Sequence, residues 1–293
     1  MTIYRRLYAP FRRHFLIMSL FIPVSLGVLH PVEGSDNAIT PTRVIDLFNG
    51  KDLSNFYTWL VDYKFEDPHR VFTVVEQIDG APAIRISGEH WGGIITREAY
   101  RDYHLIVEFR WGLLSWGSRK NRPRDSGILL HSQGPEGNSS KDYNGPWMAS
   151  IECQMIEGGT GDMILVEGYL EDGEYLVPIV KSTIRETERG NLWDPEGKVA
   201  TIDGARVNWF GKDPNLRNEF GTRGRNDVEN PAGMWNRLEV IADGDTLTYT
   251  LNGTVINKAF DANLTSGKIL IQSEGAELYL RRVELRPLES QNN

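Results

Sequence analysis

Short runs of alternating apolar and polar residues, separated by turn-forming residues, fill most of this 293-residue chain from Thr42 onward. In the clearest run, residues 103–111 (YHLIVEFRW), positions 105, 107, 109 and 111 are apolar, whereas positions 104, 108 and 110 are polar. A period of two places one set of side chains on each face of a β-strand. This run therefore predicts a strand with one buried face.

Further runs of this kind follow along the chain, and no segment has the 3.6-residue periodicity of an α-helix. They lie at residues 71–78, 83–87, 93–97, 126–131, 150–157, 163–166, 235–242, 246–251, 254–259, 268–273 and 277–285. Asp243-Gly244 and Asn252-Gly253 separate adjacent runs, and both dipeptides tolerate the positive φ angles of tight hairpin turns. The sequence predicts an all-β fold with antiparallel hairpins.

Residues 181–231 interrupt this pattern, because they are rich in glycine, proline, asparagine and charges. Long irregular segments in compact domains are usually functional or disordered, and the aromatic residues here argue against disorder. We expect this segment to form one wall of a ligand site.

Composition limits the classes of function. Hydrophobic residues make up 40% of the chain, enough for a sizeable core, and the lone cysteine, Cys153, cannot form an internal disulfide. The formal net charge of −8 argues against nucleic acid as a partner, whereas a neutral sugar is indifferent to it.

Residues 1–35 have the order of a secretory signal peptide. Arginines at positions 5, 6, 12 and 13 precede an apolar run at 15–29, and small residues follow. Pro23 interrupts the run, which is shorter than the ~20 residues of a transmembrane helix. We expect an exported protein, periplasmic or extracellular in a bacterium, with no stable membrane span once the signal is removed.

The stretch SIECQMIEGG (150–159) places polar side chains in an otherwise apolar strand. Glu152 and Gln154 share one face by alternation, and Glu157 would fall on the other. A β-bulge at Met155-Ile156 would return Glu157 to the polar face, so that both glutamates confront one pocket.

Several motifs together resemble the 3-keto-disaccharide hydrolase family. They are LFNGKDLSNF (47–56), GGIITREAYRDYHLIVEFRW (92–111), DSGILLH (125–131), SIECQMIEGGTGD (150–162), MWNRLEVIADGDTLTYTLNG (234–253) and ILIQSEGAELYLRRVELRPL (269–288). The resemblance implies a domain over residues 43–288 with a concanavalin A-like jelly-roll β-sandwich of two antiparallel sheets. The family more often has arginine where this chain has His131.

The resemblance implies cleavage of 3-keto-glycosides. A ketone at C3 acidifies the hydrogen at C2, so a base can remove it, the group at C1 is expelled, and water adds to the product. Such a site needs a base, an oxyanion stabiliser and an acid. We assign Glu152 as base, Glu157 to leaving-group departure or water activation, Gln154 to sugar binding and His131 to proton transfer or ligand binding.

Other polar and aromatic residues are weaker candidates for substrate binding, with surface ion pairs, turn ends or covers over the core as the alternatives. These candidates are Trp91, Arg124, Asp125, Trp147, Asp162 and Lys212.

Two other functions stay open. One is a non-catalytic carbohydrate-binding module, and the other is a retaining glycoside hydrolase, because Glu-x-Gln-x-x-Glu resembles the Glu-x-Asp-x-x-Glu strand of family-16 enzymes. Gln154 counts against the second, since an amide cannot share a proton with a nucleophile. No nucleotide-binding motif is present, so we expect a small-molecule or oligosaccharide substrate and no NAD; a divalent metal and the oligomeric state stay open.

Overall fold

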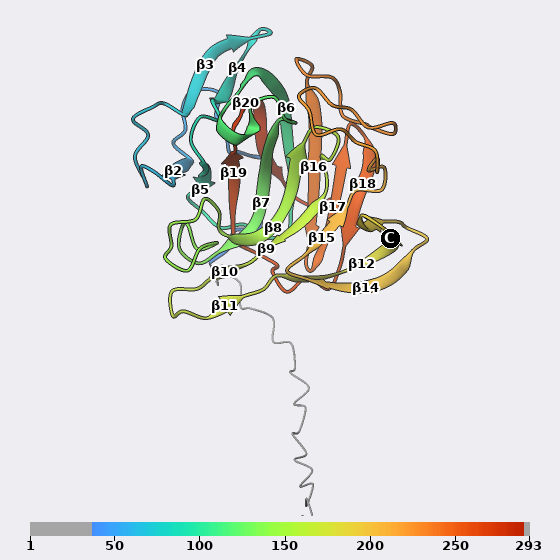
Figure 1. The fold of residues 1–293 in the computed structure, drawn as a ribbon. Coiled ribbons are helices and arrows are strands. Elements are labelled where there is room, and N and C mark those ends of the chain that lie inside the picture. Colours follow the sequence, from blue (N-terminus) through green and yellow to red (C-terminus); the bar gives the residue numbers. More distant parts are fainter. Residues whose placement is uncertain (1–36, 290–293) are drawn as a thin grey trace, which may run out of the picture. The chain divides into compact units, whose positions relative to one another are not determined.

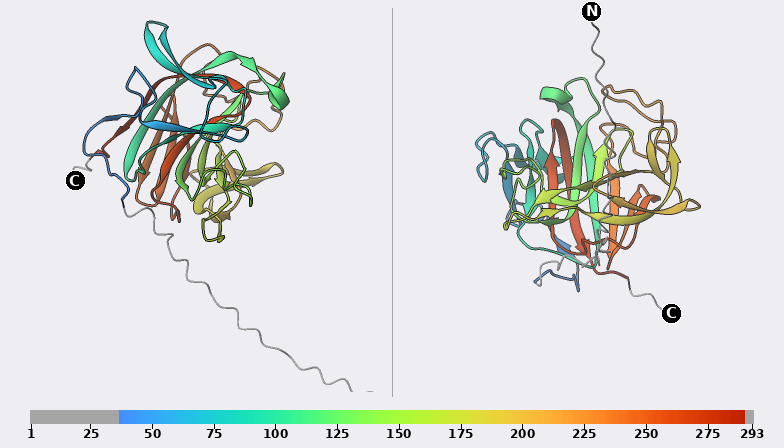
Figure 2. Two further views of the ribbon diagram at one scale, coloured as in Figure 1. Left: turned by 90° about the vertical axis from the view of Figure 1, so that its left-hand side faces the viewer. Right: turned by 60° about the horizontal axis from the view of Figure 1, so that its bottom comes forward.

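Two β-sheets packed face to face form the structure, a computed structural model that describes residues 37–289 (Figure 1). Figure 2 shows the same sheets from two further directions, with the strands of each sheet lying side by side. All named strand pairs are antiparallel except β13 with β15. The predicted all-β, jelly-roll sandwich is confirmed.

The first sheet has eight strands. In spatial order they are β18 (Thr254–Ala259), β17 (Thr246–Leu251), β16 (Asn236–Asp243), β6 (Tyr103–Ser115), β20 (Ala276–Arg286), β4 (Ala81–Ile86) and β3 (Phe72–Ile78), with β1 (Ile45–Asp46) paired to β20.

The second sheet has ten strands. In spatial order they are β14 (Lys198–Asp203), β12 (Ile179–Thr187), β13 (Gly190–Trp193), β15 (Arg206–Asn208), β9 (Met163–Val166), β8 (Ala149–Ile156), β7 (Asp125–Gln133), β19 (Lys268–Ser273), β5 (Gly92–Thr96) and β2 (Phe56–Leu60). A separate hairpin joins β10 (Gly168–Tyr169) to β11 (Tyr175–Leu176), and one 3₁₀ turn, Gly117–Arg119, follows β6.

The core fills the space between the sheets. Val107 and Phe109 of β6 are fully buried in it, as are Ile151, Cys153 and Met155 of β8. The alternation predicted for residues 103–111 is therefore confirmed. Because β8 turns its odd-numbered residues to the core, its even-numbered residues lie on the other side of the ten-stranded sheet, which we call the outer face.

Both predicted hairpins are confirmed, although the first turn consists of Gly244 and Asp245, one residue later than the predicted Asp243-Gly244. β16, β17 and β18 pair in sequence order, and Gly244, Asn252 and Gly253 adopt φ angles of +55°, +49° and +82°. These left-handed angles are the ones that two-residue hairpin turns require.

The predicted bulge at Met155-Ile156 is wrong. β8 pairs with β7 in unbroken register from Ile151 to Ile156, and the irregularity lies on β7, between Leu130 and Gln133. The strand ends at Ile156, and a turn begins at Glu157.

The expectation that residues 181–231 lack regular structure is also wrong for their first half, which forms most of β12 and all of β13, β14 and β15. The alternation of β12, in which Val180, Ser182 and Ile184 are buried, was overlooked among the charged and turn-forming residues, whereas Ile202 is the one buried residue of β14.

The proposed signal sequence, residues 1–35, lies outside the described residues. Within residues 37–289, no helix has the length and apolar character needed to cross a membrane.

Truncating Phe109 should test the core. Phe109 is fully buried between the sheets, so Phe109→Ala should lower the free energy of unfolding by about 3–5 kcal/mol. Leu113→Ala is the matched control, because Leu113 lies on the same strand but is 81% exposed. Urea unfolding of both variants measures the difference, and equal losses would contradict the assigned burial.

Candidate functional site

Glu152 lies at the centre of the outer face of the ten-stranded sheet. Glu152 pairs with Ile164 of β9 on one side and with Leu129 of β7 on the other. Ile164 pairs in turn with Arg206 of β15. Residues directly opposite one another share a face of a sheet. Arg206, Ile164, Glu152 and Leu129 therefore form one row across four strands.

A second row runs beside the first. Gln154 of β8 pairs with Gly127 of β7. The pairing of β7 with β19 places Gln272 beyond Gly127, and Gln272 in turn pairs with Gly93 of β5. This arrangement brings an amide from β19 close to the carboxyl group of Glu152.

Gly127 makes room for these side chains. A Cβ atom at this position would overlap Glu152 Oε1 and would lie 2.6 Å from Gln272 Oε1. The carboxyl and amide groups thus lie directly over the glycine backbone. A glycine inside a strand often marks such a close approach, and this signal was available in the motif DSGILLH.

The Glu152 carboxyl group is buried, and one of its oxygens has no hydrogen-bond partner among the described residues. Its side chain is 4% exposed, and both Glu152 Oε1 and Gln272 Oε1 lack hydrogen-bond partners among the described residues. The two orientations of a glutamine amide have nearly the same shape, and turning Gln272 over would point its NH₂ group at the carboxylate. A buried unpaired oxygen is costly and calls for an explanation, such as a catalytic role or a bound water or ion.

Burial raises the pKa of Glu152 to about 8, and the negative charges of Glu274 and Asp162 add to the rise, whereas Arg206 and the Gln272 amide oppose it. A carboxyl group in this range changes protonation near neutral pH and can act as base or acid.

Glu274 follows β19 and is the second titratable acid at this site. Burial raises its pKa to about 7, although Arg119 lowers it. Arg119 Nη2 donates to Glu274 Oε1 at 2.6 Å and also forms an ion pair with the fully buried Asp125. Arg119 and Glu274 were not predicted from the sequence, because their approach depends on the pairing of distant segments.

Asp162 connects the sheet to the segment after β15. Its fully buried carboxylate forms ion pairs with Lys212 and, at 3.5 Å, with Arg206, and it accepts the backbone N–H of Trp209 at 2.9 Å. The Asp162 carbonyl oxygen accepts the backbone N–H of Gln154 at 2.9 Å. Asp162, Lys212 and Gln154 thus lie together, beside Glu152.

The structure does not bring Glu157 to Glu152. Glu157 forms a buried ion pair with Arg124, and its Oε2 accepts the backbone N–H groups of Arg124 and Gly221 at 2.9 and 3.0 Å. Arg124 in turn donates to the carbonyl oxygen of Gly112 in the opposite sheet, at 2.9 Å. Glu157 therefore faces a separate cavity of about 250 Å³, next to Glu229, because its strand ends one residue earlier.

His131 also points away from the outer face. Its φ of +54° falls at the irregularity in β7 and turns the ring toward the opposite sheet, where it meets the edge of Tyr103. Nδ1 donates to the carbonyl oxygen of Leu264 at 2.9 Å, and complete burial lowers the pKa of the ring to about 4. The proton-transfer role predicted for His131 has no support in this geometry.

Trp91 and Trp147 lie together at the edge of the outer face. Their rings stack with centroids 5.9 Å apart, and Trp91 is 36% exposed. Trp147 packs against a small apolar cluster that includes Leu129 and Leu270. The two tryptophans thus flank the row that contains Glu152.

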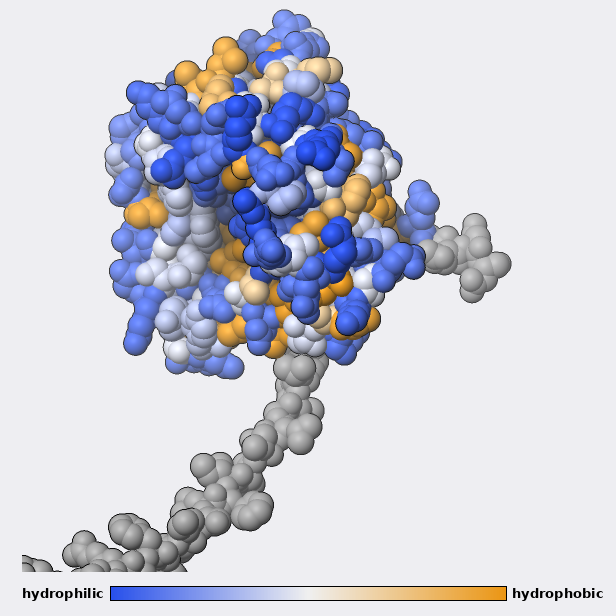
Figure 3. Space-filling view, turned by 45° about the vertical axis from the view of Figure 1, so that its right-hand side comes forward, coloured by the Kyte–Doolittle hydropathy of each residue, from blue (hydrophilic) through white to orange (hydrophobic). Residues whose placement is uncertain are grey.

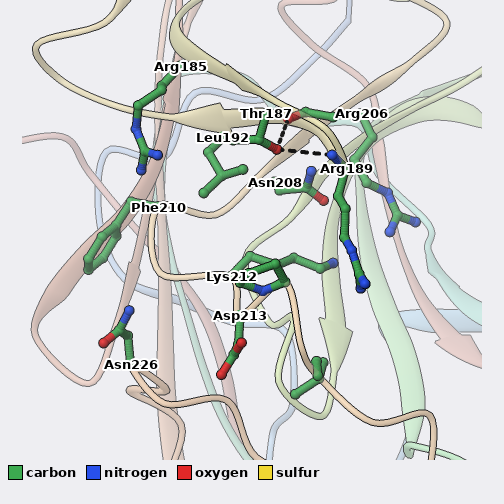
Figure 4. A pocket seen from close by; sticks show the side chains of 13 residues that line it. Arg185, Thr187, Arg189, Leu192, Arg206, Asn208, Phe210, Lys212, Asp213 and Asn226 are labelled. Carbon is green, nitrogen blue, oxygen red and sulfur yellow. Dashed lines mark hydrogen bonds between the residues drawn. The ribbon is translucent and has the colours of Figure 1, made fainter.

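A larger cavity of about 630 Å³ adjoins the site and is lined by Arg206 and Lys212 (Figure 4). Its walls come from β12, β13, β15 and the loop that follows, all within residues 185–226. In the part of the chain that the structure describes, no group of three histidine, cysteine, aspartate or glutamate side chains could hold a metal ion.

The raised pKa of Glu152 predicts a pH-dependent stability. Between the ordinary carboxyl value of 4.5 and about 8, the folded protein holds a proton that the unfolded chain releases, so this group costs stability as pH rises. Glu152→Gln removes that cost. The melting temperature of the variant relative to the unmodified protein should therefore rise from about pH 4.5 to about pH 8 and level off above that.

Calorimetry at several pH values measures this difference, with the exposed Glu188→Gln as the control for losing one carboxylate. A difference that stays constant with pH would show that Glu152 is ionised in the folded protein throughout.

Comparison with solved structures finds similar folds at low sequence identity. A Parabacteroides distasonis protein provisionally described as a glycosyl hydrolase has 18% identity and a TM-score of 0.46, over 87% of this chain and 100% of that one. A Bacillus licheniformis β-glucanase has 8% identity and a TM-score of 0.42, over 83% and 97%. The carbohydrate-binding module CBM66 of Bacillus subtilis has 11% identity and a TM-score of 0.38, over 78% and 94%.

No curated protein matches the chain. The model of one protein family, described as the 3-keto-α-glucoside-1,2-lyase-like domain, matches residues 43–286. Since this match spans most of the sequence, the chain belongs to the family of 3-keto-α-glucoside-1,2-lyase-like domains.

Proposed function

We propose that this protein is an exported enzyme that cleaves 3-keto-glycosides by base-assisted elimination followed by hydration, through a domain at residues 43–288. The observation that carries the proposal is the buried carboxyl group of Glu152, which has an unpartnered oxygen and a pKa raised to about 8. Export by residues 1–35 stays a prediction.

Glu152 is the base in this proposal. Its carboxylate takes the proton from C2 of the sugar, and the electrons of the C–H bond form an enolate whose negative charge rests on the C3 oxygen. The Gln272 amide and the Arg206 guanidinium group lie near Glu152 and are the donors available to such an oxyanion.

Glu274 takes the role of acid in place of Glu157. As the enolate collapses, the C1–O bond breaks, and the leaving oxygen receives the proton of Glu274, whose raised pKa keeps it available near neutral pH. Water then adds at C1 and gives a proton back to Glu274, while Glu152, whose proton has exchanged with solvent, protonates C2. The products are a free 3-keto sugar and an alcohol, and a separate enzyme must supply the 3-keto substrate.

The remaining predicted residues bind substrate or support the site. Trp91 and Trp147 offer an aromatic surface to a sugar ring, and Gln154 and Asp162 hold the polar face together with Lys212. Arg124 and Asp125 are buried in ion pairs with Glu157 and Arg119, so we assign them to positioning.

A carbohydrate-binding module is the second candidate, favoured by the exposed aromatic groups Trp91 and Phe65 beside the outer face. A retaining glycosidase has less support. The two carboxyl groups of such an enzyme must lie about 5 Å apart across the scissile bond. Glu157, the second carboxylate of the motif, is instead bound to Arg124 and to the backbone N–H of Gly221 and does not face Glu152.

Glu152→Gln should abolish proton removal. With a 3-keto-disaccharide as substrate, the turnover number should fall at least about 100-fold, since general base catalysis contributes that much or more. Glu171→Gln, at an exposed position, is the control and should retain activity. NMR in heavy water should show deuterium at C2 of the product, and release of the alcohol without deuterium would overturn the elimination.

The pH profile reports the same group. Because Glu152 must be ionised and Glu274 protonated, kcat/KM should pass through a maximum between apparent pKa values of about 7 and about 8 and fall on either side. Glu274 is close enough to Glu152 to couple, so these values describe the pair. A profile that is flat between about pH 6 and about pH 9 would rule out Glu152 as the base.

A further inference from the structure

The cavity of about 630 Å³ is lined by basic side chains. Arg185, Arg189, Arg206 and Lys212 line it, and Asp213 is the one carboxylate among its lining residues within the described chain. Figure 4 shows Arg189, Arg206 and Lys212 on one side of the cavity, opposite Arg185 and Phe210. Figure 3 shows one face of the molecule, turned from the view of Figure 1. Hydrophilic side chains cover most of this face, with smaller hydrophobic patches between them.

The positive charges exceed the carboxylates that face them. Arg206 and Lys212 share the single carboxylate of Asp162. Arg185 pairs through Nε with Asp194 at 3.1 Å, while Arg189 forms no ion pair with a carboxylate of the described residues. This local excess of positive charge contrasts with the net charge of −8 of the whole chain.

The position of Arg189 is fixed by its turn. Thr187 and Gly190 close a tight turn between β12 and β13, in which Arg189 N donates to Thr187 Oγ1 at 3.2 Å and Thr187 Oγ1 donates to the Gly190 carbonyl oxygen at 2.7 Å. The guanidinium group is thus attached to a short hairpin rather than to a long loop. Five N–H donors in a planar fork suit a carboxylate or another oxyanion.

The cavity adjoins the proposed base. Arg206 and Glu152 stand in one row with Ile164 between them, so their Cα atoms are two strand spacings, or about 10 Å, apart. A glycoside whose ring lies at Glu152 would direct its neighbouring unit toward Arg206 and the cavity. Leu192 and Phe210 supply apolar surface there for the faces of a sugar ring.

We propose that this cavity binds a carboxylate carried by the unit next to the cleaved sugar, so that the preferred substrates are acidic 3-keto-glycosides such as those containing a uronic acid. The proposal rests on the function proposed above for Glu152. Arg189 and Lys212 hold the carboxylate, and the apolar side chains hold the ring that bears it.

Two oxidised disaccharides that differ only in a carboxylate or a hydroxymethyl group on the neighbouring unit test this assignment. We expect kcat/KM to be about 10-fold to 100-fold higher for the acidic one, as for loss of a charge-assisted hydrogen bond. Arg189→Gln should reduce that ratio toward one. Arg101→Gln, on a residue outside the cavity, should leave the ratio unchanged.

The outcomes separate the two proposals. Equal turnover of both oxidised sugars would overturn the carboxylate site while leaving the enzymatic function intact. If neither oxidised sugar is consumed, the proposed enzymatic function fails. Calorimetry with the unoxidised acidic disaccharide then tests whether the cavity binds a carboxylate. Binding that Arg189→Gln weakens supports the carboxylate site, and no binding overturns it. A third disaccharide should carry a sulfate ester on the same unit. If its kcat/KM is higher than that of the carboxylate-bearing substrate, the choice of carboxylate is wrong.

Discussion

The unbroken pairing of residues 151–156 of β8 with β7 determines where the acidic side chains of this strand lie. It sends Ile151, Cys153 and Met155 into the core and leaves Glu152 and Gln154 on the outer face. Because side chains alternate along a strand, a slip of one residue would exchange the two sets and bury both polar groups in the core. The large apolar interior between the sheets makes that exchange costly, so the core holds the proposed site in place.

Glu152 and Glu157 lie five positions apart in the sequence but differ in how well hydrogen-bond donors stabilise their negative charge. Glu157 is surrounded by donors from Arg124 and Gly221, as expected for a carboxylate that stabilises the fold. Glu152 is buried with few donors, which raises its pKa and costs folding stability. Proteins accept such costs mainly at functional sites.

The sequence predicted the strands whose two faces differ most in burial. The run at residues 103–111 and the hairpins around Gly244 and Asn252 appear in the structure as expected. The strands β12 to β15 were missed, because charged and turn-forming residues obscured the alternation of β12 and because β14 has a single buried residue. Their position beside the sheet depends on pairing between distant segments, which one sequence does not reveal.

The candidate site shows the same limit. Glu152 and Gln154 could be placed on one face by counting residues, but the end of β8 before Glu157 and the left-handed φ of His131 could not. Both are consequences of local backbone geometry that redirect a side chain. Gln272 and Arg206 reach Glu152 only through the register of neighbouring strands.

The glycine at position 127 links two positions that are far apart in the sequence. The glutamate carboxyl group occupies the volume that even a methyl group at position 127 would need. Any side chain at 127 would therefore displace the carboxyl group of Glu152 from its present position, whereas a shorter residue at 152 leaves the glycine undisturbed. Among related chains, those that keep the glutamate at 152 should also keep the glycine at 127.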